Sequence, residues 1–96
     1  MLILIAEIAK KEFFEAKEYY ELEQSGLGSR FENEIRRALI RISEFPIMWP
    51  VEIKEIRRFV LYKFPYKILY FIDNESIIVL AFAHMHRKPT YWKKRI

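Results

Sequence analysis

The stretch IRRFVLYKFPYKILYFIDNESIIVLAFAH, residues 56–84, decides the fold of this chain. It divides into three runs that are rich in β-branched and aromatic residues: Ile56–Tyr62, Tyr66–Ile72 and Ile77–His84. The short segments between the runs contain the proline, aspartate and asparagine that are typical of tight hairpin turns. The sequence therefore predicts three consecutive antiparallel strands, a β-meander.

Two stretches before the meander have the spacing of amphipathic helices. In each of them apolar residues recur at i, i+4, i+7 and i+11, which is the period of one helix face. The first stripe consists of Ala9, Phe13, Ala16 and Tyr20, and the second of Phe31, Ile35, Ala38 and Ile42. We expect one helix from about Glu7 to Gln24 and a second that ends before Pro46, because proline disfavours a helical residue before it.

Both glycines of the chain lie between these two helices, in the segment Ser25-Gly26-Leu27-Gly28. Such a cluster can end one helix with a left-handed cap and begin another. Ser29 followed by Glu32 matches a capping box, which predicts that the second helix begins there. The two helices are therefore expected to run antiparallel.

The apolar run Leu2–Ala6 is expected to add a further strand, either at the edge of the meander or inside the sheet. The predicted order is then β, α, α, β, β, β, with residues 46–50 as a connector. We expect an α+β fold in a single domain, residues 1–96. In this fold two antiparallel helices pack on one face of a twisted, mainly antiparallel sheet whose last strand is central.

The last predicted strand is apolar on both faces. Strict alternation would place one set of side chains on one face and the intervening set on the other: Ile78, Leu80 and Phe82 against Ile77, Val79 and Ala81. Because the helices cover one face, the second face is expected to receive a partner segment, either a helix or an added strand.

Composition and charge place this chain among soluble globular domains, with 52% hydrophobic and 31% charged residues. The absence of cysteine excludes disulfides and fits the cytoplasm, and no apolar run is long enough to span a membrane. Residues 1–53 carry seven Lys or Arg against ten Asp or Glu, whereas residues 54–96 carry ten against three. The basic half is expected to face a polyanionic partner. Its candidate nucleic-acid-binding residues are Lys54, Arg57, Arg58, Lys63, Lys88 and Lys93.

The tail that begins at the end of the last strand is dense in imidazoles, cations and aromatics and contains no acids. Metal-free RNA cleavage needs a base for the 2′-hydroxyl, a cation for the phosphorane and an acid for the leaving oxygen. His84 and His86 could supply the base and the acid, Arg87 could bind the phosphate, and Tyr91 could donate a hydrogen bond or stack on a base. These four are the candidate catalytic residues. If the strand continues that far, alternation would place the two histidines on one face and Arg87 on the other, whereas a turn into Pro89 would undo this arrangement.

The same tail also has a structural reading. His84 could be a strand-end residue that a backbone carbonyl satisfies, and Tyr91 and Trp92 could hold the C-terminus over the core. Residues 93–95 would then be a solvated tail. The two histidines have no acidic neighbour and the chain has no phosphate-binding glycine loop, so we expect no metal and no cofactor.

An ordered set of residues across nearly the whole chain resembles the RelE/ParE toxins of type II toxin-antitoxin systems. The set consists of Tyr19-Tyr20, Gly26-Leu27-Gly28 with Phe31, Pro46, Trp49-Pro50, Arg57-Arg58, Phe64-Pro65-Tyr66 with Ile68 and Tyr70, Ala83-His84, Arg87, Pro89 and Tyr91-Trp92. The resemblance implies the fold described above, a growth-inhibiting toxin, and a cognate antitoxin as its partner. It also implies one of two targets: mRNA in the ribosomal A site, cleaved by the RelE branch, or DNA gyrase, inhibited by the ParE branch.

The C-terminal residues bear on the choice between the two branches. The ending Ala-His-x-x-Arg-x-Pro-x-Tyr-Trp, residues 83–92, is similar to ParE-like sequences, and the phosphate arginine of the RelE branch falls on Met85 or a neighbouring histidine. A metal-independent, ribosome-dependent endoribonuclease (an mRNA interferase) and a DNA gyrase inhibitor are thus both open. The alternative is a nontoxic small RNA- or DNA-binding module that uses the basic sheet face.

Overall fold

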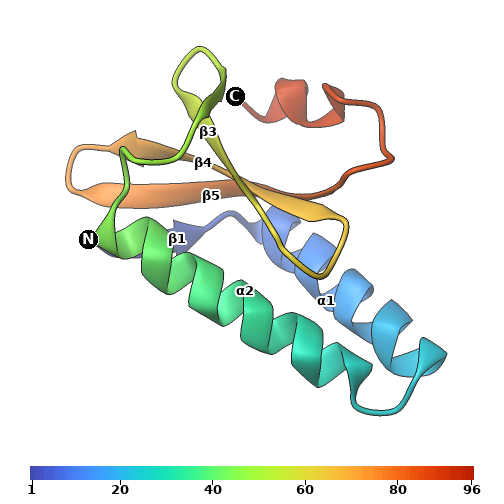
Figure 1. Ribbon diagram of the computed structural model, residues 1–96. Helices are drawn as coiled ribbons and strands as arrows, with labels where there is room; N and C mark the ends of the chain where they lie inside the picture. Colours follow the sequence, from blue (N-terminus) through green and yellow to red (C-terminus); the bar gives the residue numbers. More distant parts are fainter.

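The computed structural model of residues 1–96 has two layers, with a pair of helices on one face of a five-stranded mixed sheet (Figure 1). Its elements in chain order are β1 (Leu2–Ile5), α1 (Glu7–Glu23), α2 (Leu27–Glu44), β2 (Val51–Ile53), β3 (Ile56–Val60), β4 (Tyr66–Asp73), β5 (Ser76–His84) and the 3-10 helix η1 (Tyr91–Arg95). The strand order is β1-β5-β4-β3-β2, in which β1 is parallel to β5 and the other neighbours are antiparallel. The predicted α+β fold is confirmed, and β5 is an interior strand.

The helices bury the apolar stripes that the spacing predicted. All four residues of the second stripe are buried, as are Ala9 and Ala16 of the first. They join one core cluster with Ile77 and Val79 of β5. The helix pair therefore lies on the sheet because each stripe needs an apolar surface to cover it.

The start of α2 differs from the prediction. The helix begins at Leu27, and Gly26 before it has a φ of 88°, which glycine adopts without steric cost. Ser29 is inside the helix and does not cap it. Instead, the Glu21 carboxylate of α1 accepts hydrogen bonds from the backbone N–H groups of Gly26 and Gly28, at 3.0 and 3.1 Å. A carboxylate of the neighbouring helix thus satisfies donors that a capping box would otherwise satisfy.

The sheet contains one strand more than predicted. β2 follows the connector directly and pairs antiparallel with the start of β3. β3 ends at Val60 rather than Tyr62, because the chain then turns away as a loop. The Glu34 carboxylate of α2 holds this loop by accepting hydrogen bonds from the backbone N–H groups of Tyr62 and Lys63.

A β-bulge in β5 changes which side chains share a face. Val79 and Ala81 pair with adjacent residues of β4, so Leu80 between them is an extra residue in the ladder. Leu80 and Ala81 both pack in the cluster on the second face, and Phe82 packs on the helix side with Val79. The prediction that Leu80 shares a face with Phe82, and Ala81 with Val79, is therefore wrong.

The chain covers part of the second face with its own C-terminal tail. Figure 1 shows this segment, in red, on the side of the sheet opposite the helices. Trp92 of η1 is 1% exposed and packs against Ile56, Leu69 and Leu80. Residues 85–96 of the chain itself fold back over part of this face. The expectation that a separate partner segment covers the face is therefore wrong for that part. Neither helix has the length and apolar character needed to cross a membrane.

Candidate functional site

A hollow of about 250 Å³ lies where α1 passes the end of β5, and we call it the His84–Arg87 hollow. Two of the four predicted catalytic residues, His84 and Arg87, lie in its wall. Polar side chains from α1 and β4 complete the wall: Glu12, Glu15, Tyr19 and Tyr66. The hollow therefore brings a base, a cation, carboxylates and phenols together from α1, β4, the end of β5 and the C-terminal tail.

His84 is the last residue of β5, and its half-buried ring lies between two other rings. The centroid of the Tyr66 ring is 5.0 Å away and that of His86 is 5.1 Å away, both in edge-on contact. Its Nδ1 accepts a hydrogen bond of 3.0 Å from the backbone N–H of His86, so the neutral ring carries its proton on Nε2. Burial and the nearby His86 lower the pKa of His84, which favours the neutral ring. His84 is thus suited to accept a proton, whereas His86 lies exposed outside the hollow.

Arg87 follows a turn in which its N–H donates to the carbonyl of His84 at 3.1 Å. This turn carries the Arg87 side chain to the same hollow as His84, because β5 ends at His84 and strand alternation does not continue to Arg87. The guanidinium lies 3.7 Å from the ring centroid of Tyr91 and 3.8 Å from Oε2 of Glu12. The Arg87 side chain is still 56% exposed, and it is the cation of this site that an external anion can reach.

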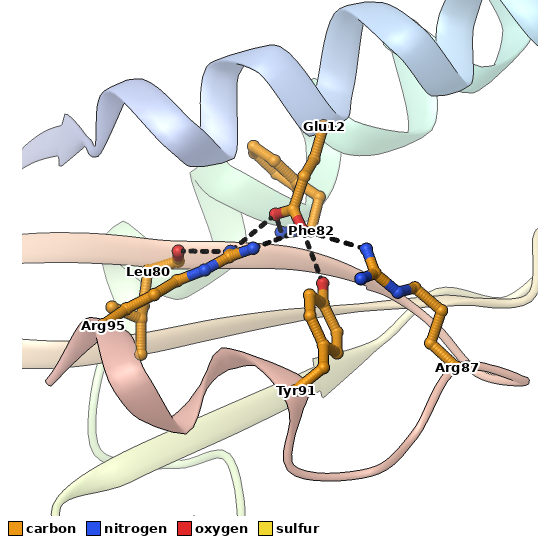
Figure 2. Close-up of polar contacts among 6 residues, drawn as sticks. All are labelled: Glu12, Leu80, Phe82, Arg87, Tyr91 and Arg95. Atoms are coloured by element: carbon orange, nitrogen blue, oxygen red, sulfur yellow. Dashed lines mark hydrogen bonds and ion pairs between the residues drawn. The ribbon is translucent and has the colours of Figure 1, made fainter.

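Glu12 of α1 is the centre of the polar contacts at this site (Figure 2). Its carboxylate accepts a hydrogen bond of 2.6 Å from the Tyr91 hydroxyl and two of 2.9 Å from the Arg95 guanidinium. It also accepts the backbone N–H of Phe82 at 3.1 Å, on the edge of β5 beyond the end of β1. Glu12 is not among the predicted site residues, because helical spacing alone places it on a solvent-facing side of α1. The one signal for it is indirect: a tail with many cations and no acids needs a carboxylate from elsewhere.

The hydrogen bonds to Glu12 limit the chemical roles that Tyr91 and Arg95 can have at this site. Burial, followed by the hydrogen bond to Glu12, raises the pKa of Tyr91, so its hydroxyl keeps its proton and donates it to Glu12. The Arg95 side chain is 14% exposed and also donates to the carbonyl of Leu80 at 3.3 Å. Arg95 is therefore an anchor of the tail, and the reading of residues 93–95 as a solvated tail is wrong at this position.

The predicted nucleic-acid-binding residues do not gather on one face. Arg57 donates to the backbone carbonyls of Ile47 and Trp49, at 3.1 and 2.7 Å, on the helix side of the sheet. Arg58 points to the other side, where it lies 3.6 Å from Glu52 of β2. The remaining four lie apart: Lys54 in the β2–β3 turn, Lys63 in the loop beside α2, and Lys88 and Lys93 in the tail.

The arrangement supplies part of what metal-free RNA cleavage requires. His84 can act as a base and Arg87 can bind an anion, both from one hollow. The hydroxyl of Tyr91 is occupied by Glu12, and the carboxylate of Glu12 would repel a phosphate placed beside Arg87. No three His, Cys, Asp or Glu side chains lie close enough together to hold a metal ion.

Comparisons with known proteins agree with this geometry at the level of fold and family. The family model described as "ParE toxin of type II toxin-antitoxin system, parDE" matches residues 3–89. A solved structure titled "Chromosomal ParDE TA system from P. aeruginosa" superposes with a TM-score of 0.66 at 11% identity, covering 90% of this chain and 97% of that one. At this identity the structural match concerns the fold alone. No curated protein matches the chain significantly.

Proposed function

This chain belongs to the ParE toxin family of type II toxin-antitoxin systems, and from that we propose that it arrests growth by binding DNA gyrase until its antitoxin neutralises it. Gyrase is the target that the resemblance assigns to the ParE branch. The proposed place of action is the cytoplasm, where gyrase, ribosomes and the antitoxin are found.

The observation that carries this proposal is the position of Glu12. Its carboxylate occupies the space among Arg87, Tyr91 and Arg95, three side chains that could otherwise surround a phosphate. A phosphorane needs a cation-rich site with an acid free to protonate the leaving oxygen. Because Glu12 engages the phenol of Tyr91 and the partly buried guanidinium of Arg95, the tail is better suited to present a fixed surface to a protein target than to cleave RNA.

Ribosome-dependent mRNA cleavage is the second candidate, and one observation favours it. His84, with its pKa lowered, and the exposed guanidinium of Arg87 line the same hollow. A neutral imidazole beside an accessible cation supplies the base and the cation of a ribonuclease site, without the acid. In this reading the ribosome or the RNA itself would supply the missing proton donor.

One set of assays separates the two candidates. The purified protein is added to a gyrase supercoiling reaction and, in parallel, to cell-free translation of a defined mRNA whose ends are mapped by primer extension. We expect loss of supercoiling with an intact message. Ribosome-dependent cuts at codon boundaries that disappear in His84→Ala/Arg87→Ala would contradict gyrase as the target and establish cleavage.

Expression in cells tests the toxin role itself. Growth should stop when the chain is expressed alone and resume when the adjacent reading frame is expressed with it. Unrestricted growth at verified soluble expression would contradict the toxin role and favour the nontoxic nucleic-acid-binding module. The affinity of such a module for single strands should fall with salt at a log-log slope of about −0.7 per phosphate contact.

A further inference from the structure

A second surface of the molecule lies along α2, next to β3 and the loop after it. Two adjoining hollows, of about 430 and 570 Å³, are found there. Both have Glu34, Arg37 and Lys63 in their walls, so they form one channel, which we call the α2 groove. The α2 groove has no lining residue in common with the His84–Arg87 hollow. A ligand of the groove would therefore bind apart from the candidate site described above.

The arginines of this chain divide into two groups. Five of the eight pair with a carboxylate or donate to a backbone carbonyl: Arg36, Arg57, Arg58, Arg87 and Arg95. The other three, Arg30, Arg37 and Arg41, are exposed, form no ion pair or hydrogen bond, and all line the α2 groove. Lys63 is a fourth exposed and unpaired cation there. The groove thus gathers every arginine that the fold leaves without a hydrogen-bond or ion-pair partner.

The three free arginines form a row along one side of α2. They stand at positions i, i+7 and i+11 of this helix, a spacing that places them on the same face. Arg37 and Arg41 are one turn apart, about 6 Å along the helix axis. A row of guanidiniums suits a ligand that repeats its negative charge along its length. The sugar–phosphate backbone of a nucleic acid does so at every nucleotide.

One carboxylate, that of Glu34, lies among these cations. It accepts hydrogen bonds from the backbone N–H groups of Tyr62 and Lys63, at 2.6 and 3.1 Å. Unlike Glu12, it pairs with no cation of its site, so the guanidiniums stay free, and four cations against one carboxylate leave a positive potential. Glu34 opposes a phosphate and a carboxylate ligand alike. The choice between such ligands therefore rests on the row of arginines and on the ring at the rim.

That ring belongs to Tyr62, which lines the groove and is 92% exposed. No other large apolar or aromatic side chain of this chain is as exposed, so its ring takes little part in packing the fold. A nucleobase can stack on such a ring while its phosphates follow neighbouring cations, and proteins hold single strands in this way. In a duplex the bases are already stacked on one another, so a duplex could use the cations but not the ring.

We propose that the α2 groove binds a single-stranded stretch of nucleic acid, with phosphates at Arg30, Arg37, Arg41 and Lys63 and a base stacked on Tyr62. This inference goes beyond the proposed function and does not depend on it. Of the six residues that the sequence predicted for nucleic-acid binding, only Lys63 belongs to this groove. Because the contacts are to charge and to ring surface and not to base edges, DNA and RNA strands of any sequence should bind.

The first test measures the binding of a labelled, mixed-sequence DNA strand of about 15 nucleotides by fluorescence anisotropy over a salt series. For the unchanged protein we expect a log-log slope of about −2.8, the value for four phosphate contacts. Arg37→Gln/Lys63→Gln should bind at least about tenfold more weakly at low salt and lower the slope to about −1.4. Lys11→Gln/Lys94→Gln is the charge-matched control at exposed, unpaired positions outside the groove, and it should lose less than about threefold. Circular dichroism confirms that each variant is folded.

The second test separates stacking from charge. Tyr62→Ala should weaken binding about fivefold or more, the effect of losing one stacked base, whereas Tyr62→Phe keeps the ring and should bind as the unchanged protein does. Three competitors are then compared: an unlabelled RNA strand, a DNA duplex and polyglutamate, each at the same concentration of negative charge. We expect the RNA strand to displace the labelled strand best.

Several results would overturn the inference. They are the absence of saturable binding below about 100 µM at low salt, equal losses in the groove and control variants, and full affinity in Tyr62→Ala. Displacement by polyglutamate as effective as that by RNA would make an acidic protein segment the ligand instead, and the same result with the duplex would make it double-stranded DNA. Because the assays contain neither gyrase nor ribosomes, none of these results bears on the proposed toxin role.

Discussion

The Tyr91 hydroxyl donates a hydrogen bond of 2.6 Å to Oε2 of Glu12, which joins two residues 79 positions apart in the chain. Through this bond and the paired bonds to Arg95, one carboxylate of α1 holds the C-terminal tail against the edge of β5 (Figure 2). The tail thereby covers the second face of the sheet and fixes the position of Arg87. Glu12 thus links the stability of the fold to the shape of the candidate site.

Replacement of Glu12 by Gln should destabilise the protein. It removes the charge that compensates the Arg95 guanidinium, which is only 14% exposed. We expect the free energy of unfolding in urea to fall by about 3 kcal/mol, since breaking a partly buried ion pair leaves a charge without a partner. Glu15→Gln is the matched control, because Glu15 lines the same hollow and its carboxylate forms no ion pair or hydrogen bond. Equal stability of the two variants would show that the network does not hold the tail.

Gly28→Ala should also destabilise the fold, by forcing the two helices apart. A Cβ at this position would lie 2.8 Å from the backbone carbonyl oxygen of Lys17 and 3.1 Å from Cβ of Glu21, both on α1. We expect a loss of about 1–3 kcal/mol in thermal or urea unfolding, as for other overpacked contacts. Gly26→Asn is the comparison: no atom lies within 4 Å of its Cβ, and asparagine tolerates a φ of 88°, so the loss should be about 1 kcal/mol or less.

His84 should titrate below the ordinary histidine value of 6.5, because burial and the neighbouring His86 lower its pKa. Since the unfolded chain binds this proton more tightly, the contribution of His84 to stability is present above pH 6.5 and is lost as the pH falls through the folded value. Imidazole resonances followed by NMR over a pH series give the midpoint, and His84→Gln assigns the signal. A midpoint at or above 6.5 would remove the argument that His84 is a neutral base at pH 7.

Two tyrosines, one buried and one partly buried, should make the protein sensitive to alkali. Burial raises the pKa of Tyr20 and Tyr70 from 10.0 to about 12. Their contribution to stability is therefore complete below pH 10 and is lost as the pH rises toward 12, because the unfolded chain ionises first. Urea unfolding from pH 9 to pH 11.5 should show this loss, with a shallower decline in Tyr70→Phe. That variant also loses the hydrogen bond of 2.8 Å to the Pro46 carbonyl, so the slope and not the absolute stability is the readout. An unchanged slope would contradict the assignment.

Local patterns were sufficient for the main elements of this fold. The apolar stripe that ends at Ile42 repeats with the helical period of 3.6 residues, and strands have a period of 2. Such periods depend only on residues that are close in sequence, so they can be recognised without the rest of the chain. The motifs at Gly26-Leu27-Gly28 and in the tail likewise led to the toxin family. His84 and Arg87 were identified as candidates because their chemistry is visible in the sequence.

Contacts between distant segments were beyond those patterns. The bulge at Leu80 arises from the register between β4 and β5, and one extra residue reverses the facing of every residue after it. The capping of α2 by Glu21 depends on how two helices pack against each other, which the local sequence of neither helix determines.

The sequence by itself thus determined both helices, four of the five strands, their order and the chemical character of the tail, because these depend on spacing along a few turns or strands. Only the tertiary structure decided that Glu12 receives Tyr91 and Arg95, that the tail covers the second sheet face and that Arg87 joins His84. The physical reason is that a carboxylate on a helix surface has no local preference among distant cations. Its partners are selected by the packing of the whole chain.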